Sequence, residues 1–193
     1  MLQYVDGSFE KMKSYNEYVA KYLDEFSLVI IEKNYYQRLM VLVEEIVKAK
    51  GYEDHHKSDN ISEKKRFMTG LLGEAALEQI LGLKIVDWSV GYSALYNRPD
   101  IFDYGVGIKT VEEGKFPVIF KYNKYPQIIC VRKVFSRAVY VCGLATVDVL
   151  NSYQDDSLIL SPNLRRRGTK TGFFGFDKLI PVKSLDDLKR IIK

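Results

Sequence analysis

The sequence predicts an α/β fold in which a central mixed β-sheet is flanked by helices, with a helical extension at the N-terminus. Helices are indicated at residues 9–25, 33–50 and 62–82, and a block of short β-branched and aromatic segments follows. Helical signals then return near the C-terminus. At 193 residues the chain is long enough for a single globular unit with a sizeable core.

The composition is that of an ordinary globular protein, with 47% hydrophobic and 28% charged residues. No run approaches the ~18 apolar residues that a membrane span needs. The first residues also lack the basic and apolar stretches of a signal peptide. We therefore expect a cytoplasmic protein with no membrane partner. Cys130 and Cys142 lie in apolar runs and are expected to be reduced core thiols.

Two helices are predicted in the N-terminal extension, at residues 9–25 and 33–50. A polar connector follows, in which the adjacent His55 and His56 have no partner at metal-binding spacing. We expect both histidines to be solvated. The extension, residues 1–61, should pack on a core formed by residues 62–193.

Residues 62–82 predict a third helix, with apolar residues around most of its circumference. Glu74 and Glu78 lie four residues apart and therefore on the same face. A buried carboxylate is costly unless it is paired, hydrogen-bonded or bound to a metal. The alternative is that both glutamates lie on a narrow exposed strip of the helix.

The period of the apolar residues changes after this helix. Strands are expected at 83–88, in a hairpin at 98–110, and at 116–120, 126–133 and 137–146. A helix at 146–153, a loop at 161–172, a strand at 173–176 and a terminal helix from Ser184 complete the prediction.

The predicted hairpin, "RPDIFDYGVGIKT", places charged residues inside an apolar segment. With a two-residue loop at 104–105, Asp100 and Lys109 are directly opposed and share one face of the sheet. A four-residue loop at 103–106 keeps that pairing, whereas a three-residue loop sends Lys109 to the other face. We therefore predict a loop that is even in length or compensated by a β-bulge.

Asp100 and Lys109 can be a simple salt bridge. Together with Glu74 from the preceding helix, however, they supply the residue types that metal-dependent phosphodiester cleavage requires. Mg²⁺ prefers oxygen ligands and keeps several waters, so two or three carboxylates suffice. A lysine can neutralise the charge that develops on the phosphate.

In these segments the chain resembles the PD-(D/E)XK nuclease superfamily, the restriction-endonuclease-like fold of restriction enzymes, phage exonucleases and Holliday-junction resolvases. The resemblance is carried by "GLLGEAALEQILG" (70–82), "RPDIFDYGVGIKT" (98–110), "RAVYVCGLAT" (137–146) and "FFGFDKLIPVKSLDDLKRI" (173–191). It implies a restriction-endonuclease-like sheet and an endonuclease that cuts DNA with Mg²⁺, for which Mn²⁺ can substitute. A homodimer is expected, because cutting two strands or a junction usually needs two active sites.

The resemblance also implies roles for individual residues. Glu74 would be the helix carboxylate that supports the metal, Asp100 its central ligand and Lys109 the catalytic lysine. The Ile108 carbonyl would complete the metal ligands. The family pattern has an acid two residues before the lysine, and this position is Gly107.

An acid from elsewhere can replace the missing one, the nearest being Asp103, Glu112 and Glu113. A literal Glu-x-Lys at 113–115 is a second choice, because it lies in a polar, turn-like stretch. The departure also motivates a different hypothesis, a catalytically impaired DNA-binding or assembly module. A third hypothesis is an interaction protein in which the charged residues are structural pairs.

Charge is unevenly distributed along the chain. Residues 1–98 hold 13 Lys and Arg against 15 Asp and Glu, whereas residues 99–193 hold 16 against 10. A basic half can attract a polyanion such as DNA, although surplus lysine is often only a solvated face. The residues expected to contact the DNA backbone are Lys121, Lys124, Arg132, Lys133, Arg165, Arg166, Arg167 and Lys170.

Overall fold

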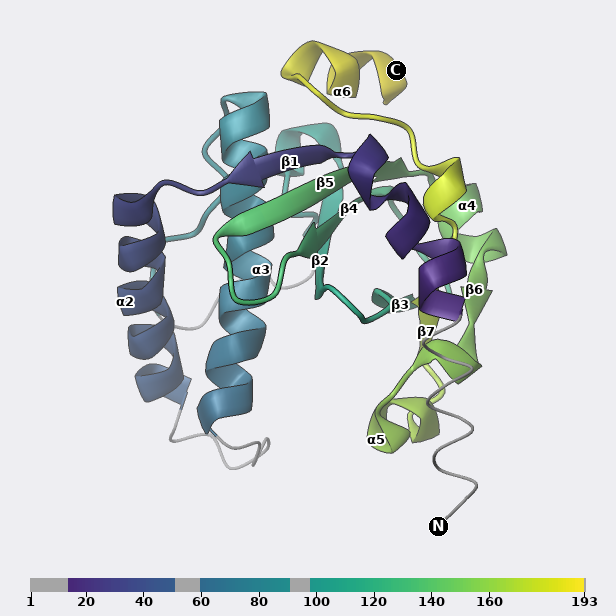
Figure 1. The fold of residues 1–193 in the computed structure, drawn as a ribbon, viewed down its shortest axis with the longest axis horizontal. Helices are drawn as coiled ribbons and strands as arrows, with labels where there is room; N and C mark the ends of the chain where they lie inside the picture. The colour runs from purple at the N-terminus through teal and green to yellow at the C-terminus, as the bar shows by residue number, and fades with distance from the viewer. Residues whose placement is uncertain (1–13, 51–59, 91–97, 193) are drawn as a thin grey trace.

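A computed structural model describes residues 14–50, 60–90 and 98–192 of the chain (Figure 1). His55 and His56 lie outside the described residues. Two β-sheets with helices around them make up the described part, which is a mixed α/β fold as predicted. Within the same ranges, no helix is both long enough and apolar enough to cross a membrane.

The larger sheet is mixed and has four strands. Its order is β1 (Ser27–Ile30), β5 (Ala138–Ala145), β4 (Gln127–Arg132) and β2 (Gly107–Glu112). β5 is antiparallel to both of its neighbours, whereas β2 runs parallel to β4. β2 therefore forms one edge of the sheet and β1 the other.

Two long helices cover one face of this sheet. α3 (Asn60–Leu81) lies against the sheet, and α2 (Lys33–Lys50) packs beside α3 (Figure 1). Their apolar side chains, Leu39, Val43, Leu72 and Leu77 among them, form one core with the sheet residues Ile128, Cys130, Val139 and Val141. Burial of this shared apolar surface holds the helices to the sheet.

A smaller sheet lies on the opposite side of the molecule from α2 (Figure 1). Its order is β3 (Val118–Phe120), β7 (Lys170–Phe173) and β6 (Gln154–Asp155). A second core joins it to the other face of the larger sheet and includes Ile119, Ile129, Tyr140, Cys142, Phe173 and Phe176. Both cysteines are free and buried, as the sequence predicts.

Three short helices complete the fold: α4 (Val147–Ser152), α5 (Pro162–Arg166) and α6 (Leu185–Ile191). Each begins with a side-chain cap, in which Thr146, Ser161 and Ser184 accept hydrogen bonds from the backbone N–H groups of Val149, Leu164 and Asp187. α4 and α6 were predicted, whereas α5 and the start of β7 lie in the segment that was expected to be a loop.

The N-terminal segment differs from the prediction. Residues 14–18 are helical and Ala20–Glu25 form a 3-10 helix, but Ser27–Ile30 form the edge strand β1. β1 pairs with β5 across residues 27–30. The expected N-terminal extension therefore contributes a strand to the main sheet as well as helices packed on it. The sequence of this segment, with three consecutive apolar residues after Ser27, lacks the alternation that signals a half-buried strand.

The strand expected at 83–88 is absent from the described structure. The backbone N–H groups of Ile85 and Val86 instead donate to the Glu78 carboxylate, at 2.7 and 2.9 Å. A side chain thus satisfies backbone groups that a neighbouring strand would otherwise have to pair. The strand expected at 173–176 is also shifted, because β7 ends at Phe173 and a 3-10 helix (Phe176–Lys178) follows.

The predicted hairpin at 98–110 is reduced to one bridged pair, Ile101 with Val106. A four-residue loop lies between them, with Gly105 in the left-handed conformation at φ 64°. The loop is even, as predicted, but the register is wrong, because it opposes Asp100 to Gly107 rather than to Lys109. Beyond Val106 the chain pairs with β4 instead, across all six residues of β2.

Candidate active site

The helix α3 approaches β2 unusually closely, and this contact positions Glu74. A Cβ atom added at Gly73 would lie 1.7 Å from the Thr110 Oγ1 atom. Only glycine allows the helix backbone to come so near the strand. Glu74, the next residue, is thereby held beside β2 in a partly buried position.

Asp100 is fixed at the open edge of β2. Its Oδ2 atom accepts a hydrogen bond of 2.5 Å from the Ile108 backbone N–H. In the ladder to β4, the N–H groups of Gly107 and Glu113 donate to Pro126 and Arg132. The backbone N–H and C=O groups of successive residues in β2 point to alternate sides of the strand. Those of Ile108 therefore point away from β4. Its carbonyl therefore lies on the same open edge as the Asp100 carboxylate.

Asp100 is close enough to Glu74 to disfavour the ionisation of Glu74. Burial raises the pKa of Glu74 to about 8, and the negative charge of Asp100 adds to the shift. Burial also raises the pKa of Asp100, although the Ile108 hydrogen bond and the charge of Lys109 oppose it. The residue Asp100 keeps an exposed surface, whereas Glu74 is half-buried.

Lys109 has a pKa shifted in the opposite direction. Burial lowers its pKa to about 8, and the positive charges of Lys170 and Arg66 add to the shift, while Asp100 opposes it. Asp100 is thus the shared neighbour of Glu74 and Lys109. An acid and a base that both titrate near neutral pH, around one edge of a sheet, are typical of catalytic sites.

Tyr125 lies beside Gly107, the position at which the sequence resemblance led us to expect an acid. A Cβ atom at Gly107 would lie 2.8 Å from the Tyr125 ring and 3.3 Å from the Gln127 side chain. Burial raises the pKa of Tyr125, and the charge of Asp100 adds to the shift, so its hydroxyl lies within electrostatic reach of the site. A side chain at position 107 would therefore require the Tyr125 ring to move.

Glu78 has a structural role. Its carboxylate accepts hydrogen bonds from the Tyr35 hydroxyl and from the backbone N–H groups of Ile85 and Val86. These bonds fasten the segment after α3 to the helix. The hypothesis that charged residues serve as structural pairs therefore applies to this glutamate.

The three replacement acids lie elsewhere. Asp103 is exposed in the 3-10 helix of the loop. Glu112 is buried at the far end of β2, where ion pairs with Lys65 (2.9 Å) and Lys115 (2.8 Å) outweigh burial and lower its pKa. Glu113 accepts a hydrogen bond from the Val134 backbone N–H. None of the three is among the described charges that shift the pKa values of the site residues.

The expected DNA contacts are scattered, and the structure brings one of them to the site. Lys170 lies within electrostatic reach of Lys109, with its ammonium group 3.1 Å from the centre of the Phe120 ring. Lys121 forms an ion pair with Asp156, at 2.6 Å. Arg132 and Lys133 lie towards the turn between β4 and β5, and the exposed cations Lys124, Arg165, Arg166 and Arg167 lie on other loops and on α5.

Two neighbours of the site were not predicted, Arg66 and Tyr125. Arg66 comes from the first turns of α3, where its guanidinium lies 4.5 Å from the centre of the Phe67 ring. Its place in the charged run "SEKKR" suggested a solvated helix start. Arg66 lies on the same helix as Glu74, whereas Tyr125 reaches the site through the pairing of β2 with β4, which no spacing in the chain signals.

Glu74 and Asp100 are the predicted acids that lie together at this edge, and the charges of Glu78 and Asp87 also raise the pKa of Glu74. Over the described ranges, no three or more His, Cys, Asp or Glu side chains form a group that could hold a metal ion. Comparisons with protein-family models, with curated proteins and with solved structures find no match for this chain.

Proposed function

We propose that this chain is a Mg²⁺-dependent DNA nuclease with Glu74, Asp100 and Lys109 at its active site. The observation that carries the proposal is the pair of carboxylates at the edge of β2, both of which have raised pKa values, with the charge of Asp100 contributing to the shift of Glu74. Neighbouring buried carboxylates cost stability unless protons or cations neutralise them. A site that tolerates this cost is suited to receive a cation.

The oxygen atoms at this edge suit Mg²⁺. Two carboxylates and the Ile108 carbonyl would hold the ion, and Mg²⁺ keeps several waters, so a small protein ligand set is sufficient. When bound, the ion would stabilise charge on a phosphate and lower the pKa of a coordinated water. A group of three protein side chains is not needed for this mode of binding.

Side chains of the protein would transfer protons, offset charge and bind phosphates. The lowered pKa of Lys109 makes it able to donate or accept a proton near neutral pH, and its ammonium form can offset negative charge developing on the phosphate. Lys170 and Arg66 would bind the flanking phosphates of the strand. Lys170 lies against the Phe120 ring, and Arg66 lies against the Phe67 ring while it also pairs with Glu63 at 3.2 Å.

Purified protein should cut supercoiled, linear or branched DNA in Mg²⁺ or Mn²⁺, and Asp100→Ala should abolish cutting while sparing DNA binding. The matched control is Asp103→Ala, which removes an exposed acid three residues away and should leave cutting unchanged. If all three kinds of DNA stay intact while a control nuclease cuts them, the catalytic proposal is wrong.

A second candidate function is a DNA-binding or assembly module without catalysis. It is favoured by the Tyr125 ring over Gly107, which closes the position where the family has its third acid. Salt-dependent DNA binding without metal-dependent hydrolysis would support this function over the first. In that case Lys170→Gln would weaken binding, and Glu74→Gln would not.

A further inference from the structure

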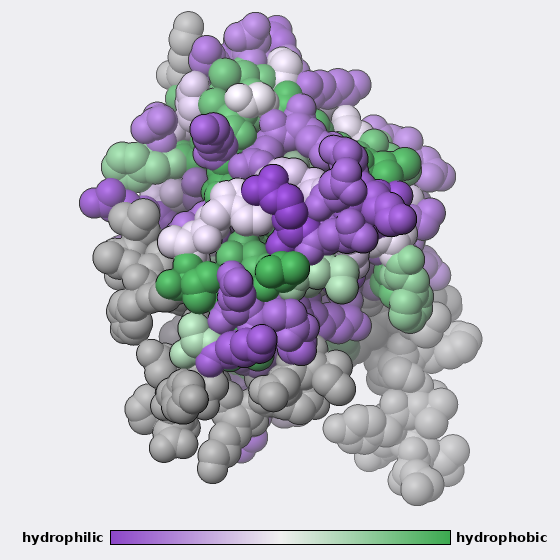
Figure 2. Space-filling view, turned by 90° about the vertical axis from the view of Figure 1, so that its left-hand side faces the viewer, coloured by the Kyte–Doolittle hydropathy of each residue, from purple (hydrophilic) through white to green (hydrophobic). Residues whose placement is uncertain are grey.

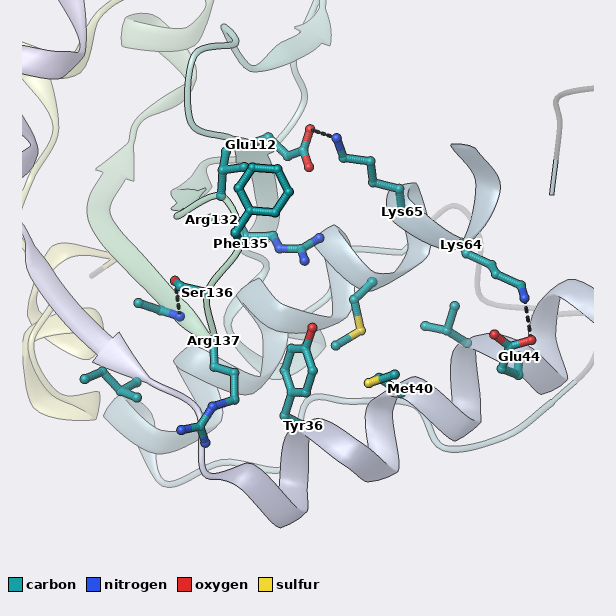
Figure 3. Close-up of a pocket in the computed structure, with 15 residues that line it drawn as sticks. Tyr36, Met40, Glu44, Lys64, Lys65, Glu112, Arg132, Phe135, Ser136 and Arg137 are labelled. Atoms are coloured by element: carbon teal, nitrogen blue, oxygen red, sulfur yellow. Dashed lines mark hydrogen bonds and ion pairs between the residues drawn. The ribbon is translucent and has the colours of Figure 1, made fainter. Parts of the chain in front are cut away.

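A large groove lies on the α2 side of the molecule, away from the β2 edge that carries the candidate active site. It is bounded by α2, α3 and the turn between β4 and β5, and its volume is about 910 Å³ (Figure 3). Ligand pockets have volumes of roughly 300–1,000 Å³. The groove is therefore large enough for several side chains of a partner.

Positive charge in this groove exceeds negative charge. Its lining contains Lys64, Lys65, Arg132 and Arg137 but only two acids, Glu44 and Glu112. Lys64 pairs with Glu44 at 2.6 Å, and Lys65 pairs with Glu112 at 2.9 Å, as Figure 3 shows. Both acids are thus neutralised by lysines. The two arginines remain as surplus charge.

Neither arginine has a carboxylate partner among the described residues. Arg132 donates to the Thr69 hydroxyl at 3.2 Å, and its Nε–H is buried without an acceptor in the described structure. Arg137 donates to the Ile31 carbonyl at 2.9 Å. In Figure 3 the Arg132 guanidinium points into the groove, towards α3. A half-buried guanidinium that has no carboxylate partner among the described residues is suited to bind a carboxylate through its terminal nitrogens.

Phe135 stands at the turn that borders the groove. Its side chain is 102% exposed, and its backbone has φ 55°, a conformation that bulky residues seldom adopt. Such strain persists only where the surrounding structure enforces it, and it is concentrated at functional sites. An exposed aromatic ring on a strained turn is consistent with a ring that a partner covers.

Apolar residues accompany the arginines. Met40 on α2 is 50% exposed and Ile30 on β1 is 65% exposed, and both line the groove with the buried Val43 and Met68. Figure 2 views this side of the molecule and shows apolar side chains gathered between hydrophilic ones. Contact with these apolar residues would contribute no binding free energy to the phosphates of a nucleic acid. Apolar side chains of a peptide would gain binding free energy by being buried against them.

We propose that this groove binds an acidic peptide segment of a partner protein, one that carries large apolar side chains between its carboxylates. A carboxylate of the peptide pairs with Arg132, and its apolar side chains pack on Met40, Met68 and Phe135. The site is separate from the candidate active site and does not rest on the proposed nuclease function.

Panning a library of random dodecapeptides against the full chain tests this proposal. Counter-selection uses the Arg132→Gln/Phe135→Gly double variant, and enriched peptides should combine Asp or Glu with Leu, Ile, Phe or Trp. In fluorescence anisotropy, each single variant should bind a labelled enriched peptide at least about ten-fold more weakly. The matched control is Lys133→Gln, an exposed cation beside the turn that does not line the groove, and it should bind normally.

Phe135→Gly keeps the test meaningful if Arg132→Gln fails to fold, because glycine accepts the positive φ without strain. Peptides without acidic residues, or binding that survives both variants, would overturn the proposal. Displacement of the peptide by duplex DNA, with DNA binding lost in the same variants, would assign the groove to nucleic acid instead. A dimer in light scattering that these variants dissociate would assign it to a second copy of the chain.

Discussion

Glu74 and Lys109 are an acid and a base whose pKa values both lie at about 8. Burial produces both shifts, because an uncharged group is easier to bury than a charged one. Each shift therefore lowers the free energy of unfolding at pH values where the group is charged in the unfolded chain but neutral in the folded protein. The protein retains both groups despite this cost. Neighbouring groups whose charged forms are disfavoured by burial are typical of functional sites.

Replacement of Glu74 by Gln should flatten the dependence of stability on pH. A carboxyl whose folded pKa is about 8 and whose ordinary value is 4.5 binds more protons in the folded state between those values, so stability falls as pH rises from about 5 to 8. The variant should lose this decline, roughly 2–4 kcal/mol, in urea unfolding at pH 5 and pH 8. Glu45→Gln, at an exposed position on α2, should leave it in place.

Gly107→Glu should destabilise the protein by about 1–3 kcal/mol, because its Cβ atom would lie 2.8 Å from the Tyr125 ring. In a Tyr125→Ala background the same substitution should cost much less. Calorimetric titration with Mn²⁺ should then show tighter binding for Gly107→Glu/Tyr125→Ala than for Tyr125→Ala alone, since a third carboxylate is available. Equal Mn²⁺ affinities would mean that position 107 does not face the site.

Residue types and their order in the sequence suggested Glu74, Asp100 and Lys109, which the structure brings into electrostatic reach of one another through Asp100. They did not indicate what stands beside Gly107. Tyr125 lies in a polar connection before β4, and its ring reaches Gly107 because β2 and β4 run side by side. A contact of this kind depends on strand pairing, which local sequence patterns do not specify.

At the scale of elements, β2 shows why the predicted hairpin failed. Alternation and a turn signal fit two antiparallel strands, but the buried run of β4 offers β2 a longer ladder of six paired residues. The segment before the loop keeps only the Ile101–Val106 bridge. Asp100 is thereby freed from a strand position, and its carboxylate bonds to the edge of β2 instead of facing Lys109 across a ladder.

The close packing of α3 on β2 can be tested through Gly73 and Thr110. Gly73→Ala should cost roughly 1–3 kcal/mol or more, because the new methyl group would overlap the Thr110 hydroxyl. Thr110→Ala removes a buried hydroxyl without a hydrogen-bond partner in the described structure, so it should be nearly neutral alone and should partly rescue Gly73→Ala. A double-mutant cycle in urea measures this coupling.

Gly82→Ala provides the comparison for a glycine substitution without crowding. No atom lies within 4 Å of an added Cβ there, and the cost comes only from its positive φ of 66°. Thr110→Ala should give Gly82→Ala no rescue. If it rescues both glycine variants equally, the contact between α3 and β2 is not the cause.

At the scale of the whole molecule, the sequence predicted the α/β class, most strands of the larger sheet and the capped helices α4 and α6. It did not reveal β1, whose four residues become a strand only because β5 provides a partner. It also placed a boundary at residue 61, whereas β1 and α2 share the sheet and core of the later residues. The secondary structure of long segments with a clear apolar period can be predicted from their own sequence. That of short segments such as β1 depends on the strands with which they pair.

β5 is buried along all eight of its residues, and its side chains enter both cores in alternation. Neither core can therefore open without exposing a strand that the other core also needs. The two halves of the molecule should unfold as one cooperative unit, and the amide protons of β5 should exchange with deuterium only through global unfolding. Hydrogen-exchange mass spectrometry would show this as equal protection for peptides from β5 and from α3.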